Sequence, residues 1–457
     1  MVFGTDGVRD RAGKGYLAPE SVRRLVQAIA GVLRQPELFP HEFPPIRGDT
    51  VYIGRDTRRS GEDLLAQVSE EFRRQGFPVA DLGVLPTGGV AYTASVAADC
   101  CLAVVLSASH NPATYNGVKL LSPTGAKVPV AFEEMISDRY HRPAPSTASA
   151  GTEAPRIDLA GTAVREYVEF LVGCCRYPER LRGRRLALDT AHGAAYRVAP
   201  EVFQALGMEL ETLGNSPSGK NINEGCGSLH PEKLARVVRS SGACLGFCFD
   251  GDADRMIPVC ASGQILDGDH SLALAGRYYY REGKLPKRAV VATVMSNLGL
   301  EKALDLDGLR LVRTPVGDRC VYECLERECH PLGGEQSGHL IFMDALRTGD
   351  GILAAIRLLD SLQSDSLDLD AEAAIVKKYP QILRNVRIRE KTPFEQLPAV
   401  AEVVRRAEES LGTEGRVLLR FSGTEPLARV MLEGPDQKTI DRLCDKICRS
   451  IEDSLPA

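Results

Sequence analysis

A serine and a histidine follow directly on an apolar run in the stretch LAVVLSASHNPATYNGVK, which spans residues 102–119. A buried strand that leaves its sheet needs polar groups for its last backbone hydrogen bonds, and the Asn-Pro pair here also fits ordinary turn chemistry. The same residue types allow a second interpretation. In it, the hydroxyl of Ser109 is a nucleophile at a strand end, with His110 beside it and Lys119 nearby.

A second unusual loop, DGDADR, carries Asp250, Asp252 and Asp254 at alternating positions. Three carboxylates this close repel one another unless a cation or solvent compensates their charge. Oxygen ligands in this number favour Mg²⁺ or Ca²⁺ over zinc. An EF-hand loop would need Gly at its sixth position and Glu at its twelfth, where this chain has Arg255 and Ala261. The apolar run LGFCF before the loop disfavours a freely solvated acidic turn, so we predict a Mg²⁺ site.

Two groups of residues are suited to binding phosphate. Arg255, next to the acidic loop, can hold a phosphate through two hydrogen bonds. A tail segment offers two guanidiniums, two hydroxyls and a glycine that lets backbone N–H groups approach an anion. Its members are Arg420, Ser422, Gly423, Thr424 and Arg429. A capped turn with surface arginines is the alternative for this segment. No G-x-x-x-x-G-K-[ST] or G-x-G-x-x-G loop is present, so nucleotide binding is not supported.

The loop GEQSGH offers Glu335, Ser337 and His339 between two glycines. A carboxylate and a hydroxyl on a tight loop suit sugar hydroxyls, although they also suit a plain polar turn. Together the four loops favour phosphoryl transfer on a sugar phosphate, with Ser109 as phosphate carrier and Mg²⁺ neutralising charge. A serine hydrolase would need a G-x-S-x-G elbow, which the chain lacks. A haloacid-dehalogenase-type phosphatase would want Thr or Val in place of Asp254.

Composition limits the class of protein. A chain of 457 residues with 44% apolar and 26% charged residues fits a globular protein of two to four domains. The net charge of 56 − 61 = −5, without a long basic run, disfavours nucleic acid as the main ligand. No apolar run approaches membrane-spanning length, and the first ten residues lack the core of a secretory peptide. Thirteen cysteines without a regular framework indicate free thiols in a reducing compartment, so we expect a cytoplasmic protein.

Three cysteines and a histidine are a candidate zinc site by residue type. Cys320, Cys324, Cys329 and His330 lie close together in the sequence, but they lack the C-x-x-C spacing of structural zinc sites. We therefore favour no zinc site there.

The elements that must position these loops follow a repeated pattern. Three apolar runs at 51–57, 184–193 and 289–297 predict strands, and helical patterns follow the first two at 61–76 and 196–207. Strands alternating with helices predict parallel sheets built from β-α-β units. In such sheets ligands bind beyond the carboxyl ends of the strands, where the polar loops lie.

The chain end is organised differently. Strand candidates at 385–390, 416–421 and 428–434 alternate with helix candidates at 398–412 and 437–453, which predicts a small α+β domain. Loop-like stretches at 143–156 and 361–372 indicate boundaries. We predict four domains, each with one of the loops, at 1–155, 156–260, 261–370 and 371–457.

In this order, the motifs resemble the α-D-phosphohexomutase superfamily, and within it the bacterial branch that acts on glucosamine phosphates. The resemblance covers essentially the whole chain. It runs through FGTDGVRD, SASHNPATYNGVK, NINEGCGS, DGDADR, RTPVGDR, GGEQSGH, YPQILRNV and RFSGTEP. It implies a heart-shaped enzyme with three α/β domains, a small C-terminal α+β domain and one central cleft.

The resemblance also implies roles for individual residues. Ser109 is the phosphorylated serine, and the Mg²⁺ ligands are Ser109, Asp250, Asp252 and Asp254. Proton transfer or support of the phosphoserine falls to Lys119 and His110, with Arg9 and Arg255 nearby. Sugar hydroxyls are bound by Glu335 and Ser337. The phosphate that is not transferred is bound by Arg420, Ser422, Gly423, Thr424 and Arg429.

The implied activity is that of an isomerase. Glucosamine 6-phosphate and glucosamine 1-phosphate would interconvert through a phosphoserine and a 1,6-bisphosphate, supplying amino-sugar precursors for cell-wall synthesis. A hexose 1,6-bisphosphate would act as activator, and a homodimer would form through the first domain. Gln336, where a Met is familiar in enzymes acting on glucose and mannose phosphates, favours glucosamine phosphate. The alternatives are a mutase for those hexose phosphates and a non-catalytic regulator that binds sugar phosphates.

Overall fold

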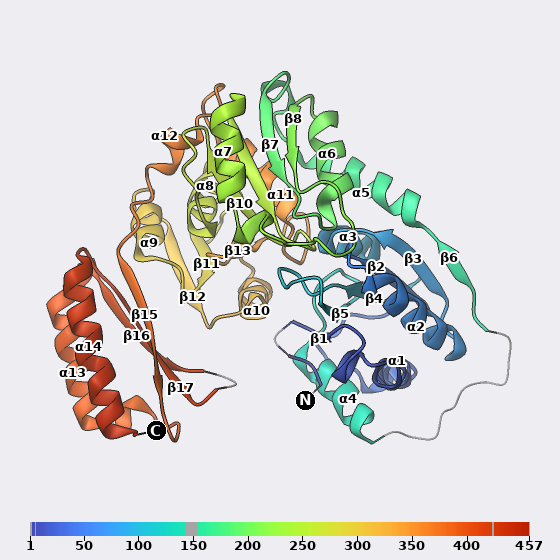
Figure 1. The fold of residues 1–457 in the computed structure, drawn as a ribbon, viewed down its shortest axis with the longest axis horizontal. Helices are drawn as coiled ribbons and strands as arrows, with labels where there is room; N and C mark the ends of the chain where they lie inside the picture. Colours follow the sequence, from blue (N-terminus) through green and yellow to red (C-terminus); the bar gives the residue numbers. More distant parts are fainter. Residues whose placement is uncertain (1, 5, 143–152, 423–424, 457) are drawn as a thin grey trace.

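The structure, a computed structural model, describes residues 2–4, 6–142, 153–422 and 425–456 of the chain. These residues form four sheet-containing units in chain order. In Figure 1 the first unit lies at the lower right with the second above it, the third lies to their left, and the C-terminal unit lies at the lower left. The predicted architecture of three α/β units and a smaller α+β unit is confirmed.

The first unit is a six-stranded mixed sheet with the strand order β1-β5-β4-β2-β3-β6. Its strands are β1 (Val8–Arg11), β2 (Thr50–Arg55), β3 (Val79–Val84), β4 (Cys100–Leu106), β5 (Tyr115–Leu121) and β6 (Arg156–Asp158). Its helices are α1 (Pro19–Leu33), α2 (Ser60–Arg74), α3 (Thr87–Val96) and α4 (Val130–His141). Strand β4 is buried along its whole length, as expected for a strand with both faces covered.

Helix α2 shows how the sequence pattern builds this unit. Leu64, Leu65, Val68 and Phe72 recur at helical spacing and are buried, because they lie on one face of the helix. Charged residues occupy the first and last turns in the order that favours the helix dipole, acidic first and basic last.

The second unit has the strand order β10-β9-β7-β8, with only β10 antiparallel to its neighbour. Its strands are β7 (Arg185–Asp189), β8 (Glu209–Leu213), β9 (Leu245–Phe249) and β10 (Met256–Cys260). Its helices are α5 (Ala160–Cys174), α6 (Ala195–Ala205) and α7 (Glu232–Ser241). Strand β6, which opens the predicted second domain, pairs with β3 of the first sheet, so the chain passes to the second unit after it.

The third unit has the strand order β12-β11-β13-β14. Its strands are β11 (Ala289–Thr293), β12 (Arg310–Thr314), β13 (Leu332–Gly334) and β14 (Leu340–Phe342). Its helices are α8 (Gly268–Arg281), α9 (Leu298–Asp305), α10 (Asp318–Glu328), α11 (Gly351–Ser361) and α12 (Leu369–Ala373). The predicted strands at 51–57, 184–193 and 289–297 are therefore confirmed as β2, β7 and β11.

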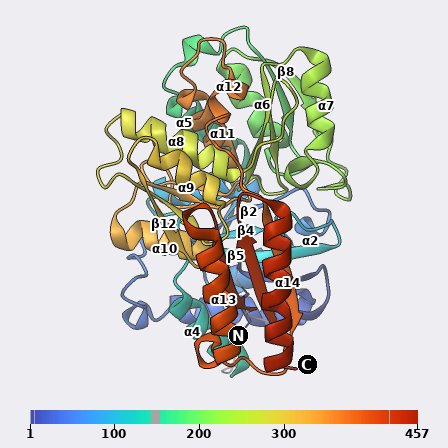
Figure 2. The same cartoon turned by 90° about the vertical axis from the view of Figure 1, so that its left-hand side faces the viewer.

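The C-terminal unit is a three-stranded antiparallel sheet with the order β15-β17-β16. Its strands are β15 (Gln381–Arg387), β16 (Arg416–Phe421) and β17 (Leu427–Glu433), and its helices are α13 (Pro398–Leu411) and α14 (Gln437–Ser454). The two helices lie side by side over one face of the sheet (Figure 2).

The buried apolar side chains are divided unequally among the units. One cluster joins side chains from the first three units, from Tyr52 to Val376, and the first unit has a further cluster of its own. The C-terminal unit has a separate cluster between Val386 and Leu455. Among the described residues, no helix has the length and apolar character that would let it span a membrane.

The predicted boundary loop at 143–156 has its residues 143–152 outside the described part of the chain. The predicted domain limits at 155/156, 260/261 and 370/371 stay predictions.

Candidate active site

Ser109 lies in the turn that links β4 to β5, three residues after β4 ends. Its φ of 50° lies in the left-handed region, which is uncommon for a residue with a side chain. The Ser107 hydroxyl accepts a hydrogen bond from the Ser109 N–H at 2.9 Å and donates one to Asp56 at 2.6 Å. These bonds fix the direction of a turn that is strained at Ser109.

Arg58, which is fully buried, holds the same turn through hydrogen bonds to its backbone carbonyls. Its Nε pairs with Asp56 Oδ2 at 2.7 Å, and its Nη2 donates to the carbonyls of Ser109 at 2.9 Å and Asn111 at 2.8 Å. Neither residue belongs to the motifs that predicted the site. A signal was available, because Asp56 and Arg58 directly follow β2, the parallel neighbour of β4.

Asn223, from the motif NINEGCGS of the second unit, completes the support. Its Nδ2 donates to the carbonyls of Ser109 at 2.9 Å and Asn111 at 3.1 Å. The serine loop is therefore held jointly by the first two units.

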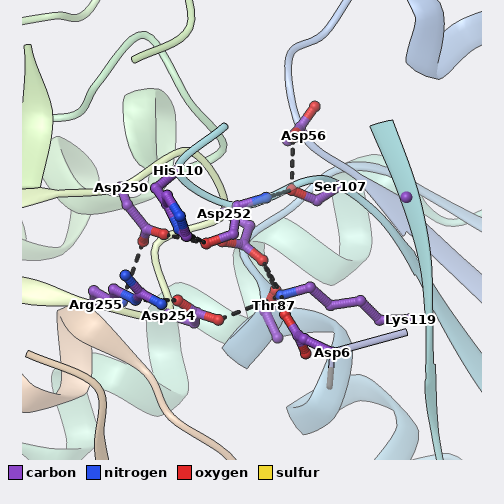
Figure 3. A network of polar contacts seen from close by, with 12 residues as sticks. Asp6, Asp56, Thr87, Ser107, His110, Lys119, Asp250, Asp252, Asp254 and Arg255 are labelled. Carbon is purple, nitrogen blue, oxygen red and sulfur yellow. Dashed lines mark hydrogen bonds and ion pairs between the residues drawn. The ribbon is translucent and has the colours of Figure 1, made fainter. Parts of the chain in front are cut away.

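The acidic loop follows β9 and faces the serine loop (Figure 3). Asp250, Asp252 and Asp254 are all buried, and one oxygen from each lies within 4.8 Å of the others. The Ser109 hydroxyl donates a hydrogen bond to Asp250 Oδ2 at 2.6 Å. Burial, followed by the neighbouring charges of Asp254 and Asp252, raises the pKa of Asp250 well above its usual range.

The donor set of this loop fits a divalent cation. The Oδ1 atoms of Asp252 and Asp254 are buried without a hydrogen-bond partner, a costly arrangement that a cation would relieve. Converging carboxylate oxygens suit Mg²⁺. In the described part of the chain, this triad is the one group of three or more His, Cys, Asp or Glu side chains whose ligand atoms converge closely enough to hold a metal ion. The cysteines and histidine between Cys320 and His330 do not form such a group.

Lys119, on β5, is the cation that faces the triad. The antiparallel register sets Lys119 opposite Val105, so it returns to the end of β4 that carries the serine loop. Its Nζ lies 2.8 Å from Asp252 Oδ2, 2.8 Å from Asp6 Oδ2 and 3.4 Å from Asp254 Oδ2. Burial opposes the charge, but the three carboxylates outweigh it and raise the pKa of Lys119 well above its usual range.

Asp6 extends this contact into a network across three units. Its Oδ1 lies 2.6 Å from Lys127 Nζ, which also pairs with Asp318 of the third unit. His339 lies 3.8 Å from both Asp254 and Asp318. Burial disfavours ionisation of Asp254, yet Lys119 and His339 outweigh it and hold the pKa of that carboxyl well below its usual range.

The remaining predicted groups near the serine also converge. Arg9 pairs with Asp6 at 3.2 Å, the Arg255 N–H donates to Asp250 Oδ1 at 3.2 Å, and Arg255 Nε lies 3.8 Å from Asp254 Oδ1. His110 Nδ1 lies 3.3 Å from Ser109 Oγ. Burial, with the nearby Arg255 and Arg9, lowers the pKa of His110 to about 4.

The predicted sugar loop joins β13 to β14. Glu335 accepts a hydrogen bond from the Gly317 N–H at 3.3 Å and is near enough to help raise the pKa of Arg255, against the burial that lowers it. The Ser337 hydroxyl is buried without a partner. Gln336 is turned to α8, where its amide donates to Asp269 at 3.0 Å.

The predicted phosphate loop lies between β16 and β17. Arg420 and Arg429 are directly opposite in the register of these strands, and the Nε of each is buried without a hydrogen-bond partner. Burial, followed by the Arg429 charge, lowers the pKa of Arg420. Ser422 is buried, whereas Gly423 and Thr424 lie outside the described residues. Arg429 Nη2 also lies 3.6 Å from Glu425 Oε2. Two facing guanidiniums whose Nε donors are unpaired suit an anion.

Comparison with protein-family models also divides the chain into four domains. Models for all four domains of the phosphoglucomutase/phosphomannomutase family match in order: alpha/beta/alpha domain I at residues 1–146, domain II at 165–263, domain III at 267–379 and the C-terminal domain at 383–450. The chain belongs to the phosphoglucomutase/phosphomannomutase family.

Within this family, curated relatives that are 40–44% identical to it over nearly the whole chain are phosphoglucosamine mutases. That of Anaeromyxobacter sp. is 43% identical over 464 residues, covering 99% of this chain and 96% of the relative. That of Symbiobacterium thermophilum is 44% identical over 458 residues, covering 99% of both.

Solved structures show the same fold. A phosphoglucomutase/phosphomannomutase family protein from Burkholderia thailandensis matches with a TM-score of 0.79 at 24% identity, covering 100% of this chain and 98% of that one. Aspergillus fumigatus N-acetylphosphoglucosamine mutase, solved with GlcNAc-6P and magnesium, matches with a TM-score of 0.66 at 18% identity, covering 99% and 95%.

Proposed function

We propose that the protein interconverts glucosamine 6-phosphate and glucosamine 1-phosphate, the reaction for which its curated relatives are named. One observation carries the proposal: the Ser109 hydroxyl lies 2.6 Å from Asp250 in a buried carboxylate triad that Lys119 faces. A nucleophile, a metal-type loop and a cation thus meet at one point, as phosphoryl transfer requires.

In the first transfer, the O1 hydroxyl of glucosamine 6-phosphate attacks the phosphorus carried by Ser109. The bond from phosphorus to O1 forms, the bond to Ser109 Oγ breaks, the O1 proton passes to a base, and Ser109 Oγ takes up a proton to become a hydroxyl. Lys119 donates a hydrogen bond to the phosphoryl group or to the departing serine oxygen, and His110 lies within reach of that oxygen.

In the second transfer, the 1,6-bisphosphate reorients in the site. The Ser109 hydroxyl then attacks the phosphorus of the 6-phosphate and gives its proton to a base. The bond from phosphorus to Ser109 Oγ forms, the bond to O6 breaks, O6 takes up a proton, and glucosamine 1-phosphate leaves. A hexose 1,6-bisphosphate would phosphorylate an enzyme that has lost its phosphate, which makes it the proposed activator.

Ser109, Asp250, Asp252 and Asp254 would hold Mg²⁺. The ion would supply positive charge against the transferring phosphoryl group. Arg255 and Arg9 would bind phosphate oxygens beside this group and so hold it in line for attack.

The other two loops would hold the substrate. Glu335 and Ser337 would bind sugar hydroxyls, which the unpartnered Ser337 hydroxyl supports. The phosphate that is not transferred would bind the tail loop formed by Arg420, Ser422, Gly423, Thr424 and Arg429. The facing guanidiniums of Arg420 and Arg429 support this assignment.

We also propose a cytoplasmic location and a homodimer formed through the first unit. All 13 cysteines are free thiols, which supports a reducing compartment. Size-exclusion chromatography with light scattering would test the dimer.

The deciding experiment measures kcat/KM for the 6-phosphates of glucosamine, glucose and mannose with Mg²⁺ and a hexose 1,6-bisphosphate. We expect a clear preference for glucosamine 6-phosphate, with residual activity on glucose 6-phosphate. Glucose or mannose phosphate in first place would assign the enzyme to hexose phosphates. Binding without turnover of any of them would indicate a regulator instead.

Ser109→Ala tests the carrier. Intact-mass measurement should find phosphate on the active wild type and none on the variant, which should fold and lose turnover. Ser262→Ala, at an exposed serine outside the site, is the matched control and should keep both phosphate and activity. Near-normal turnover by Ser109→Ala would end the proposal.

A further inference from the structure

The C-terminal unit meets the rest of the chain through polar contacts. Its apolar cluster, between Val386 and Leu455, is separate from the cluster shared by the other units. Hydrogen bonds and ion pairs link the C-terminal unit to the third unit, such as Arg416 Nη2 to the Ser296 carbonyl at 2.7 Å and Lys302 Nζ to Glu414 at 3.0 Å. Polar interfaces of this kind allow domains to move relative to each other.

Asn297, the N-cap of α9, lies at the centre of these contacts and is 1% exposed. Its Nδ2 donates to the Tyr379 carbonyl at 3.0 Å and to Glu433 Oε1 at 3.1 Å. Its Oδ1 accepts from the N–H groups of Tyr379 and Gly299, both at 2.9 Å. The side chain thus uses both of its donors and both acceptor positions. Tyr379 belongs to the connection into β15, and Glu433 ends β17.

The backbone of Asn297 is tied to the sugar loop on its other side. Asp269, buried at the start of α8, accepts a hydrogen bond from the Asn297 N–H at 2.9 Å and one from Gln336 Nε2 at 3.0 Å. The Gly268 N–H also donates to the Gln336 carbonyl at 2.9 Å. A Cβ at Gly268 would lie 2.0 Å from the Glu335 carbonyl, so helix and loop are in close contact.

Glu433 and Gln336 are the outer members of this hydrogen-bonded path, and each lies on the same segment as residues proposed to bind the substrate. Glu433 is four residues along β17 from Arg429, which is about 13 Å at the usual strand rise. A small rotation of the C-terminal unit about Glu433 therefore moves Arg429, and Arg420 opposite it, farther than it moves residues next to Glu433. At the other end, Gln336 lies between Glu335 and Ser337.

We propose that Asn297 is a positioning residue that couples the sugar loop, through Gln336 and Asp269, to the orientation of the C-terminal unit. The proposal rests on the proposed function, because it takes the loop at 335–337 to hold the sugar and Arg420 and Arg429 to hold its distal phosphate. Gln336 then affects substrate binding through the angle of the C-terminal unit rather than by touching the sugar.

A double-mutant cycle tests the coupling. Gln336→Leu removes the hydrogen bond to Asp269. Glu433→Gln keeps the side-chain length but replaces one carboxylate oxygen by NH2, so Asn297 Nδ2, the Leu298 N–H and Arg416, which all bind Glu433, are left with a single acceptor oxygen. Binding of glucose 1,6-bisphosphate to dephosphorylated enzyme is measured by calorimetry. We expect the loss caused by Gln336→Leu to be smaller in the Glu433→Gln background, with a departure from additivity of about threefold or more. Gln264→Leu, at an exposed glutamine, is the control.

Additive effects of the two substitutions would overturn the coupling, because Gln336 and Glu433 would then act independently. An absence of bisphosphate binding by the wild type would instead refute the proposed function, and the orientation measurement below would still decide the role of Asn297.

Small-angle X-ray scattering without ligand tests the orientation directly. We expect Asn297→Ala to have a larger radius of gyration than the wild type, and an unchanged profile would overturn the role of Asn297. Should Asn297→Ala unfold, Asn297→Asp alone and combined with Glu433→Gln replace it. Asp beside Glu433 repels, whereas Asp accepts a hydrogen bond from Gln. The double variant should therefore return towards the wild-type profile, and no such return would count against the proposal.

Discussion

At the scale of single residues, a buried arginine holds the turn that carries Ser109, the proposed phosphate carrier. Arg58 and Asp56 are both fully buried, and Arg58 binds the two carbonyls that define the serine turn. Burial raises the pKa of Asp56, although Arg58 and the Ser107 hydroxyl oppose the rise. The pair therefore exists at a desolvation cost, which removal of one partner exposes.

We predict that Arg58→Met lowers the free energy of unfolding by about 3–5 kcal/mol, because Asp56 is left as an uncompensated buried charge. Urea denaturation measures the change. Asp56→Asn combined with Arg58→Met should be less destabilised than Arg58→Met alone. Arg59→Met, at the exposed neighbour, should change stability little. Equal stability of Arg58→Met and wild type would contradict the prediction.

The sequence revealed residues with unusual chemistry but not the residues that hold them. Ser109 and the three aspartates lie in motifs whose combination of side chains is unusual for a structural turn. Arg58 and Asn223 look like ordinary polar residues, and their role depends on pairing over 51 and 114 positions of the chain. Such pairing follows from the packing of two units, which local patterns do not encode.

At the scale of elements, the turn between β9 and β10 concentrates negative charge where β4 delivers the serine. We predict that a chelator abolishes turnover and that added Mg²⁺ restores it. Asp252→Ala should lower kcat by about 100-fold or more, because charge at the transferring phosphoryl group is no longer offset. Asp365→Ala, at a side chain 90% exposed, is the control. Activity indifferent to both treatments would exclude a catalytic metal here.

Local sequence patterns also did not predict which residues of neighbouring strands pair with each other. In the tail, α13, α14, β16 and β17 agree with the prediction to within one residue, because alternating and helical patterns are local. Strand β15 begins four residues before the predicted strand at 385–390 and ends three residues before it. The pairing of Lys119 with Val105 is not local in this sense. Nor could the sequence foresee that β6 joins the first sheet as its edge strand.

Helix α11 ends in a buried carboxylate whose ionisation is linked to folding. Asp360 accepts hydrogen bonds from the backbone N–H groups of Arg176, at 2.9 Å, and Tyr177, at 3.4 Å. Arg357 lies 3.8 Å away. Burial outweighs these contacts and raises the pKa of Asp360 to about 6. The folded state therefore binds a proton more tightly here than the unfolded chain, whose Asp pKa is about 3.9.

We predict that the stability of the wild type relative to Asp360→Asn falls as pH rises from about 4 to about 6 and is constant above that range. The sign follows because the folded state holds more protons than the unfolded state within this window. Urea unfolding of both proteins at several pH values measures the difference. A difference that is flat or rises with pH would contradict the raised pKa.

At the scale of the whole molecule, the candidate site is divided among four units of unequal attachment. The first three share a core and the network from Asp6 to His339, so the serine, the acidic triad and the sugar loop are held together. The C-terminal unit, with its own core, carries Arg420 and Arg429, the residues proposed to bind the distal phosphate. In the proposed mechanism, this division would let the C-terminal unit move while the intermediate turns and the proposed reacting groups stay fixed.

The same division predicts that the phosphate loop can be weakened without disturbing the serine. Arg420→Met and Arg429→Met should each lower kcat/KM by about 10- to 100-fold, mainly through KM, because each removes charged hydrogen bonds to the distal phosphate. The amount of phosphate on Ser109, measured by intact mass, should not change. Arg405→Met, on the exposed face of α13 in the same unit, supplies the control. An unchanged KM in both variants would show that the distal phosphate binds elsewhere, and loss of phosphate from Ser109 would show that the units are not independent.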